Sequence, residues 1–186
     1  MKRKTAKEVL VESFREIAER KDVDKITVKD ITENCGYSPA TFYRQFRDKY
    51  ALIAWDYARE LERIMSGLDG SREEWQKALR RAADFFQAHK GYLANLFLHT
   101  SGYESFIIYM REVNFESLRG IAEKYHGNNS VDEMTVMYIR FYVLGTVQFT
   151  CEWILGRIEA TPEELAMVYE QTVPAPLQAF LRRMRD

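Results

Sequence analysis

The residue types with the greatest capacity for specific recognition gather in one stretch, from Ser38 to Lys49. Hydroxyl groups at Thr41 and Tyr43 and a guanidinium at Arg44 can hydrogen-bond phosphate oxygens and base edges. Two phenylalanines four residues apart would share one helical face and leave these polar groups on the others. The pattern is typical of the recognition element of a helix-turn-helix. An ordinary helical hairpin is the alternative.

The elements that would position these side chains are also encoded locally. Thr27 and Asp30 have the spacing of a capping box, which predicts the start of a first short helix. Gly36 ends that helix, because glycine adopts the left-handed conformation that a tight turn between helices needs. Ser38 then caps a second helix, and Pro39 takes its first position, where no N–H is required.

The run from Gly36 to Lys49, GYSPATFYRQFRDK, resembles the signature G-x-S-x-x-T-F-Y-x-x-F-x-x-K of the TetR/AcrR transcriptional regulators. Every fixed position is matched in register, and the resemblance covers residues 5–55. It implies a homodimer, an effector pocket in a helical C-terminal domain and a phosphate contact for the final lysine. The segment 24–31, DKITVKDI, is also similar to regulators of the dihydroxyacetone kinase type, some of which are activators with protein partners.

Contacts with double-stranded DNA are predicted for two groups of residues. Those expected near base edges are Tyr37, Pro39, Ala40 and Arg44, and those expected on the backbone are Thr27, Ser38, Thr41, Tyr43 and Lys49. The two-fold symmetry of a homodimer predicts a palindromic operator, with half-sites one helical turn or a multiple of it apart.

The composition is that of a folded protein with a substantial core. The 186 residues are 46% hydrophobic and 13% aromatic, which argues against disorder. Cys35 and Cys151 have neither disulfide nor zinc-ligand spacing, which favours a reducing cytoplasm. No signal peptide is indicated, and the most apolar stretch, Phe141–Leu155, is too interrupted by polar residues to cross a membrane.

A net charge of −1 conceals a modest asymmetry along the chain. Residues 1–50 hold 12 Lys and Arg against 9 Asp and Glu, whereas residues 51–186 hold 15 against 19. The basic end is therefore the end with the motif. The difference is too small to predict nucleic-acid binding by itself.

Motifs for catalysis are missing from the sequence. No P-loop, dinucleotide-binding glycine motif, paired-histidine motif or Cys-x-x-Cys pair occurs. His89, His99 and His126 have no metal-ligand spacing, so neither a metal nor a cofactor is predicted. We expect no enzyme. A small helical enzyme is the rival from another class, and it would need titratable side chains converging in a pocket.

The periodicity of apolar residues predicts an all-α fold, because no strand-like alternation of useful length occurs. Three helices over residues 1–50 would form a helix-turn-helix DNA-binding domain, and residues 51–186 a larger helical domain for effector binding and dimerisation. Helices are expected over residues 5–20, 49–68, 72–90, 92–99, 103–125 and 131–155, and from residues 161 and 175 onward. The helix over 49–68 would link the two domains mechanically.

The helix expected over residues 131–155 is apolar around more than half of its circumference, which predicts burial in the core or against a partner. Since the resemblance implies a four-helix interface, this helix and residues 174–186 are expected to form the dimer contact. Buried tyrosine hydroxyls can orient a small molecule. The residues predicted to line an effector pocket are Phe86, Tyr92, Phe97, His99, Tyr103, Phe106, Tyr109, Met110, Tyr138 and Tyr142.

These observations predict a sequence-specific DNA-binding transcriptional regulator, a repressor that a small-molecule effector releases from a palindromic operator. The alternative is a regulator, activators included, whose C-terminal domain binds a protein partner rather than a metabolite. Packing of the C-terminal helices without a cavity would favour that alternative.

Overall fold

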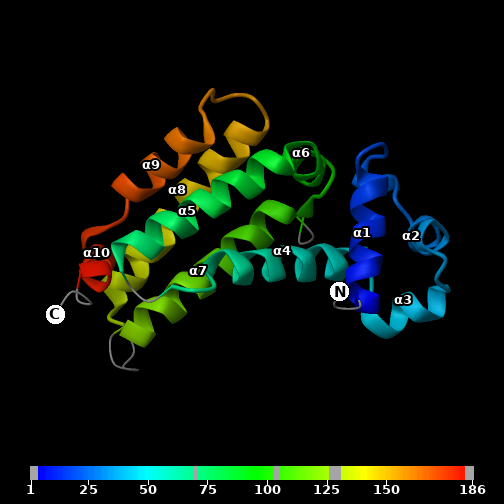
Figure 1. The fold of residues 1–186 in the computed structure, drawn as a ribbon, viewed down its shortest axis with the longest axis horizontal. Helices are drawn as coiled ribbons and strands as arrows, with labels where there is room; N and C mark the ends of the chain where they lie inside the picture. Colours follow the sequence, from blue (N-terminus) through cyan, green and yellow to red (C-terminus); the bar gives the residue numbers. More distant parts are fainter. Residues whose placement is uncertain (1–3, 69–70, 103–104, 126–130, 183–186) are drawn as a thin grey trace.

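The computed structural model describes residues 4–68, 71–102, 105–125 and 131–182, and these residues form an all-α fold without strands. Figure 1 shows a small unit of three helices at one end and a larger helical body at the other, with one long helix running from the first into the second. The elements are α1 (Ala6–Ala18), the short 3-10 turn η1 (Val23–Lys25), α2 (Val28–Cys35), α3 (Pro39–Gln45), α4 (Lys49–Met65), α5 (Arg72–Ala88), α6 (Lys90–Leu98), α7 (Phe106–Tyr125), α8 (Glu133–Ile154), α9 (Pro162–Gln171) and α10 (Ala175–Arg182).

The helix starts predicted from capping residues are confirmed in the small unit. Thr27 and Asp30 form a reciprocal capping box at the start of α2, and the Ser38 side chain accepts from the Thr41 N–H at the start of α3. Gly36 ends α2 with a φ of 72°, in the left-handed region that favours glycine. Local chemistry therefore sets the boundaries of the helix-turn-helix.

A compact apolar core holds the three short helices together and joins them to α4. Its members are fully or nearly fully buried, namely Leu10, Phe14, Ile17, Ile31, Phe42, Phe46 and Leu52. Burial of side chains of this size stabilises a fold by about 1.5–3 kcal/mol each, before the entropy of ordering them is subtracted. The small unit and the beginning of α4 thus share one core.

In the larger body, α5 packs along α9 and α7 packs along α8. One face of α8 is buried through Ile139, Val143 and Val147, whereas Met137 and Phe141 on the opposite face are exposed. One side of this widely apolar helix therefore belongs to the core, and the other side is uncovered in the single chain. Its burial against a partner stays a prediction.

Two boundaries differ from the sequence-based expectation. Gly91 was expected to separate two helices, but it lies inside α6, and the break falls at His89, whose N–H caps α5 by donating to the Phe85 carbonyl. The start of the following helix was expected at Tyr103, which lies outside the described residues, and α7 begins at Phe106. Among the described residues, no helix is both long and apolar enough to span a bilayer.

Candidate nucleic-acid interface and its link to an internal cavity

Helix α3 packs against the small unit with one face and is exposed on the other. Phe42 and Phe46 are buried and anchor it to the small unit, with the Phe46 ring 5.9 Å from the Trp55 ring of α4. Ala40, Tyr43 and Arg44 lie on the exposed side, and Tyr43 is 59% exposed. An aromatic ring and a guanidinium on a rigidly anchored short helix have the shape and chemistry that a major groove admits.

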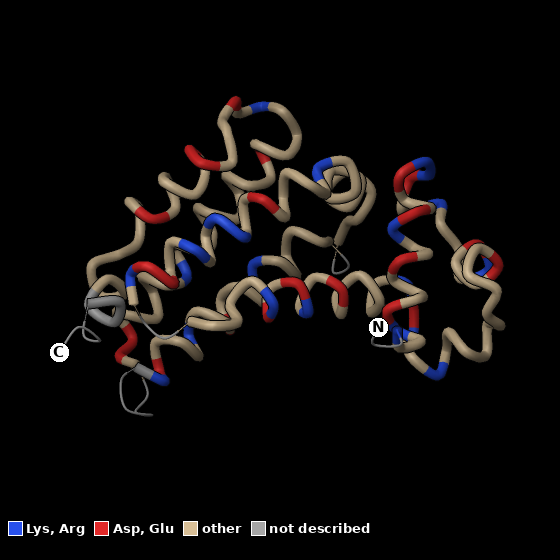
Figure 2. Tube along the Cα trace, in the orientation of Figure 1, with Lys and Arg blue, Asp and Glu red and all other residues tan. Residues whose placement is uncertain are grey.

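Hydrogen bonds between side chains order the polar face of α3. The Ser38 and Thr41 hydroxyls lie 3.1 Å apart, and Arg44 Nη2 donates to Thr41 Oγ1 at 3.1 Å. A guanidinium has five N–H donors, so this bond uses only part of its capacity. Arg44 is also the only charged residue within α3, whereas α4 and α5 carry charged positions of both signs (Figure 2). This side chain is therefore pre-positioned while donors remain for an external acceptor.

The remaining predicted DNA contacts lie beside α3. Thr27 is exposed at the start of α2, Tyr37 is half-buried in the turn, and Pro39 is exposed at the start of α3. Lys49 opens α4, and its Nζ donates to the backbone carbonyls of Val23, Asp24 and Ile26 at 2.8–2.9 Å. The resemblance to the TetR/AcrR regulators implied a phosphate contact for this lysine. The structure supplies internal partners, while the phosphate contact stays a prediction.

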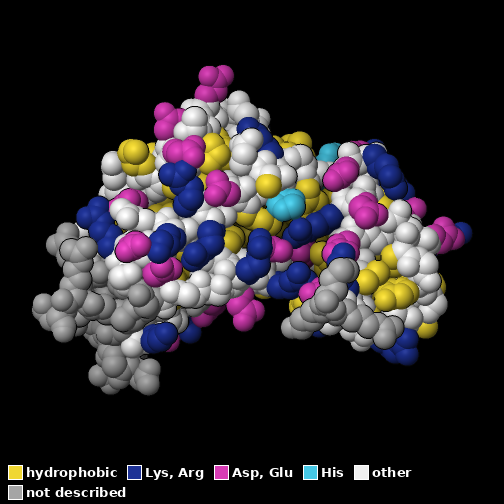
Figure 3. All heavy atoms as spheres, in the orientation of Figure 1, with side chains coloured by type: hydrophobic (Ala, Val, Ile, Leu, Met, Phe, Trp, Pro, Cys, Tyr) yellow, Lys and Arg dark blue, Asp and Glu magenta, His cyan; other side chains and the backbone are white. Residues whose placement is uncertain are grey.

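Charge on the visible face of the larger body is mixed. Lys and Arg alternate with Asp and Glu over α4 and α5 (Figure 3). A surface of mixed sign makes no broad field that would attract DNA. This face of the larger body therefore offers no broad basic surface for DNA.

A buried polar cluster connects the small unit to the larger body. Arg15 of α1 makes two hydrogen bonds of 2.8 Å to Asp56 of α4, and the Tyr92 hydroxyl of α6 donates to the same carboxylate at 3.2 Å. Asp56 is only 2% exposed, and Glu60 lies 3.6 Å from Arg15. Carboxylates buried this deeply are held in structures only when charged and hydrogen-bonded partners surround them. We call Arg15, Asp56, Glu60 and Tyr92 the joint cluster.

Burial governs the titration of the joint cluster. It raises the pKa of the Asp56 carboxyl, and the Arg15 guanidinium opposes that rise in part. It also raises the pKa of the Tyr92 hydroxyl well above its usual value. Tyr92 therefore keeps its proton and remains a donor to Asp56.

A second set of contacts strengthens the same connection. The Asn95 amide of α6 donates to the carbonyls of Ala18 and Lys21 at 2.7 and 2.9 Å, and its oxygen accepts from the Val23 N–H at 3.0 Å. His99, near the end of α6, lies 3.6 Å from a carboxylate of Asp22. Helix α6 is thus fastened to the end of α1 and to η1.

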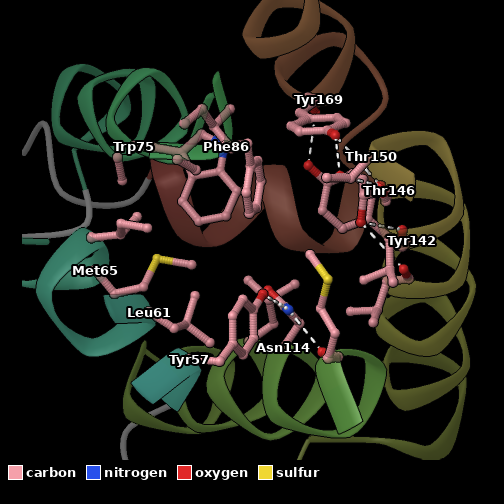
Figure 4. A pocket seen from close by; sticks show the side chains of 18 residues that line it. Tyr57, Leu61, Met65, Trp75, Phe86, Asn114, Tyr142, Thr146, Thr150 and Tyr169 are labelled. Atoms are coloured by element: carbon pink, nitrogen blue, oxygen red, sulfur yellow. Dashed lines mark hydrogen bonds between the residues drawn. The ribbon is translucent and has the colours of Figure 1, made fainter. Parts of the chain in front are cut away.

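The larger body contains an internal cavity of about 70 Å³. In Figure 4, Leu61 and Met65 of α4 lie on one side, Trp75 and Phe86 of α5 above, and a group of hydroxyl-bearing side chains on the far side. That hydroxyl group consists of Tyr142, Thr146 and Thr150 of α8 and Tyr169 of α9. Tyr57 of α4 and Asn114 of α7 complete the floor.

Helix α4 serves both sites with neighbouring residues. Asp56 faces α1 in the joint cluster, whereas Tyr57 lines the cavity, where its hydroxyl accepts from the Asn114 amide at 2.6 Å. On α5, Phe85 lies 6.0 Å from the Arg15 guanidinium, and the adjacent Phe86 lines the cavity. On both α4 and α5, therefore, one residue contacts Arg15 of the small unit and the next residue lines the cavity.

An apolar groove of about 370 Å³ lies on the outside of the larger body, between α8 and α9. Phe141, which is 79% exposed, and Phe149 line it from α8. Val168 of α9 and Thr172, directly after α9, line the other side. Three residues, Tyr142, Thr146 and Tyr169, line both this groove and the internal cavity. We call them the shared wall.

The residues predicted to line an effector pocket are distributed over several places. Phe86, Met110 and Tyr142 line the cavity. The others that the structure describes lie elsewhere: Tyr92 in the joint cluster, Phe97 and Phe106 packed against each other, Tyr109 bonded to the Ala54 carbonyl, His99 beside Asp22, and Tyr138 on the outer face of α8. Tyr103 lies outside the described residues. Sequence reasoning missed the contributions of α4 and α9.

Helix α3 is anchored on one face and exposed on the other, and a buried polar cluster joins its unit to an all-helical body. This arrangement is typical of helix-turn-helix transcriptional regulators. Residues 10–54 match the family described as bacterial regulatory proteins, tetR family, and residues 73–174 match the family described as transcriptional regulator C-terminal region. The chain belongs to the TetR family of transcriptional regulators, whose members bind DNA and form dimers.

Solved structures with the same fold are found at low sequence identity. The dihydroxyacetone kinase operon activator DhaS superposes with a TM-score of 0.64 at 14% identity, covering 94% of this chain and 96% of that one. A TetR transcriptional regulator from Rhodococcus sp. RHA1 gives 0.60 at 15% identity, with 92% and 96% covered. One from Streptococcus agalactiae 2603V gives 0.62 at 18%, with 90% and 93% covered. No curated protein matches the chain significantly in sequence.

Proposed function

We propose that this TetR-family regulator is a homodimeric repressor that binds a palindromic operator and is released from it by a small molecule in the cavity. The observation that carries the proposal is the exposed face of α3, where Tyr43 and Arg44 stand on a helix anchored by two buried phenylalanines. Arg44 would read a base edge, and the hydroxyls of Ser38 and Thr41 would contact phosphates.

The second copy would pack on the apolar face of α8, as expected from the sequence, with α9 beside it. The part of residues 174–186 in this contact, also expected from the sequence, stays a prediction. Phe141, Met137 and Val168 are exposed in the single chain, and exposed apolar patches of this kind mark interaction sites. A two-fold dimer presents two α3 helices, which fit half-sites about 34 Å apart or a multiple of that. A palindromic operator follows from this symmetry.

Release would depend on α4. This helix contributes Tyr57, Leu61 and Met65 to the cavity and Asp56 to the joint cluster. A ligand that binds better to one position of α4 shifts the protein toward the corresponding spacing of the two α3 helices. A spacing that no longer matches the half-sites weakens DNA binding.

Selection of bound sequences from a random DNA pool, followed by gel-shift titration, tests the proposal. We expect enrichment of a two-fold symmetric motif. Arg44→Ala should weaken binding to it by about 1–3 kcal/mol, whereas Arg157→Ala, an exposed arginine of the larger body, should not. Enrichment of no motif, or binding of one asymmetric half-site by a monomer, would refute the proposal.

A regulator that responds to a protein partner is the second candidate. The structural neighbour DhaS is named as an operon activator, and the segment 24–31 resembles regulators of that kind. The internal cavity between α4, α5, α7, α8 and α9 favours a small-molecule effector, because a domain that binds a protein partner is expected to pack without a cavity.

A further inference from the structure

The lining of the internal cavity is uncharged. Among the described residues that surround it, none is Asp, Glu, Lys, Arg or His. Placing an ion in such a site would remove its hydration without supplying a counter-charge, which is strongly unfavourable. A molecule that occupies the cavity must therefore be neutral.

The hydroxyl-bearing side of the cavity already satisfies its own hydrogen bonds. The Tyr142 hydroxyl donates to the Tyr169 carbonyl at 2.7 Å, and the Thr146 hydroxyl donates to the Tyr142 carbonyl at 2.9 Å. The Thr150 hydroxyl donates to the Thr146 carbonyl at 2.7 Å and lies in hydrogen-bond contact with the Tyr169 hydroxyl. These hydroxyl groups donate to acceptors within the same group of residues, as the dashed lines of Figure 4 show, so an acceptor on a ligand gains little by competing for their protons.

Trp75 contributes a donor that has no partner. Its side chain is 4% exposed and lines the cavity, and its indole N–H has no partner among the described residues. A buried donor without an acceptor is unfavourable, and supplying an acceptor recovers that loss. The other two tryptophans serve other roles. Trp153, for example, donates to the Ala160 carbonyl at 2.7 Å.

Resting on the proposed function, we propose that the effector is a neutral, mainly apolar small molecule with a hydrogen-bond acceptor, such as a ketone, ester or ether oxygen, which the Trp75 indole N–H binds. The apolar part of the ligand would lie against Leu61, Leu79 and Phe86. Carboxylates, phosphates and ammonium compounds are excluded by the uncharged lining.

The size of the cavity implies that the ligand enlarges it. An engineered cavity of about 150 Å³ holds benzene, whereas this one measures about 70 Å³. Met65 and Met110 line it, and methionine side chains adapt readily because they are unbranched and flexible. A ligand that displaces Met65 pushes directly on α4, the helix that carries Asp56 of the joint cluster.

Nuclear magnetic resonance of the indole N–H groups tests the proposal on the full-length chain. The three tryptophans give three side-chain signals, and Trp75→Phe identifies the one from Trp75. The probes are cyclohexanone, methylenecyclohexane and cyclohexylammonium, which have the same number of heavy atoms. The ketone carries a neutral acceptor, the alkene has none, and the ammonium is charged.

We expect cyclohexanone to move the Trp75 signal downfield, methylenecyclohexane to bind roughly 2- to 10-fold more weakly, and cyclohexylammonium not to bind. Trp75→Phe should make the affinities for the ketone and the alkene equal, and Trp153→Phe should leave the ratio of the two affinities unchanged. Equal binding of the ketone and the ammonium, no preference for the ketone over the alkene, or no response to any probe would each overturn the inference. The comparison in the unmodified chain does not depend on the variants.

Operator binding is measured separately, without any probe. If the chain binds an operator but cyclohexanone gives no response, the proposed class of effector is wrong, while the proposed function as a DNA-binding regulator stands. If cyclohexanone binds as expected but no DNA motif is enriched, the proposed function fails while the chemistry of the cavity stands.

Discussion

Lys49 illustrates how a residue can serve the fold at a position where its charge is unfavourable. The Asp48 side chain caps α4 by accepting from the Ala51 N–H, which places Lys49 at the helix N-terminus, where the macrodipole disfavours a cation. Its three carbonyl acceptors at 2.8–2.9 Å, two in η1 and one directly after it, compensate for this. The lysine therefore fastens η1 to the start of α4.

Replacing Lys49 by methionine should lower the free energy of unfolding by about 1–3 kcal/mol, because partly buried carbonyls lose their donor. The stem of the side chain is preserved, so packing changes little. Urea denaturation measures the effect. Lys25→Met, which removes an exposed lysine paired with Asp22, is the control and should leave stability nearly unchanged. An equal response of the two variants would remove the structural role of Lys49.

Asp30 should make stability depend on pH. Hydrogen bonds from Lys21 and from Thr27 lower the pKa of its carboxyl to about 2, below the value of about 3.9 for an unfolded chain. Because the folded-state pKa is depressed, its contribution is complete above pH 4 and is lost as pH falls toward 2. Unfolding measured from pH 6 to 2 should show a larger loss in the natural sequence than in Asp30→Asn, where Asp22, Asp132, Glu164 and Glu170, whose pKa values are also lowered, still contribute. Glu33→Gln, exposed on the same helix, should retain it.

At the scale of the elements, α4 has two faces with different purposes. Asp56 and Glu60, four residues apart, face Arg15, whereas Tyr57 and Leu61 face the cavity. A pair of carboxylates at this spacing lies on one helical face and can signal a shared polar contact, but the partner is 41 residues away. Sequence spacing therefore indicates that such a contact exists without naming its other half.

A double-mutant cycle between Asp56 and Tyr92 should measure the strength of the joint cluster. Tyr92→Phe removes only the hydroxyl that donates to Asp56 and should lower the free energy of unfolding by about 1–2 kcal/mol. With Asp56→Asn, we expect a coupling of about 0.5–3 kcal/mol from denaturation of the single and double variants. Additive effects within error would show that the two groups do not act together.

The helix-turn-helix was predictable because its signals are local. The capping residues at Thr27, Ser38 and Asp48 and the positive φ of Gly36 act within a few positions of where they stand. The cavity was much less predictable. It is assembled from helices far apart in the sequence, and an abundance of tyrosines could not show that Tyr92 faces a carboxylate while Tyr169 faces the cavity.

For the whole molecule, the uncovered face of α8 and α9 sets the expected assembly. Phe141→Glu should convert dimers to monomers, because a charge would be buried at the centre of the contact. The single chain should keep its stability, since this side chain is 79% exposed in it. Analytical ultracentrifugation measures the change. Leu98→Glu, also exposed but on α6, should remain dimeric. A dimeric Phe141→Glu protein would place the interface elsewhere.

Because of the shared wall, a ligand in the internal cavity and a second copy of the chain at the external groove can influence each other. Tyr142, Thr146 and Tyr169 line both the internal cavity and the external groove. A ligand that moves this wall from the inside changes the surface offered to a second copy, and by reciprocity a second copy changes the affinity for the ligand. The concentration of the protein itself would then help to set the effector concentration at which it responds.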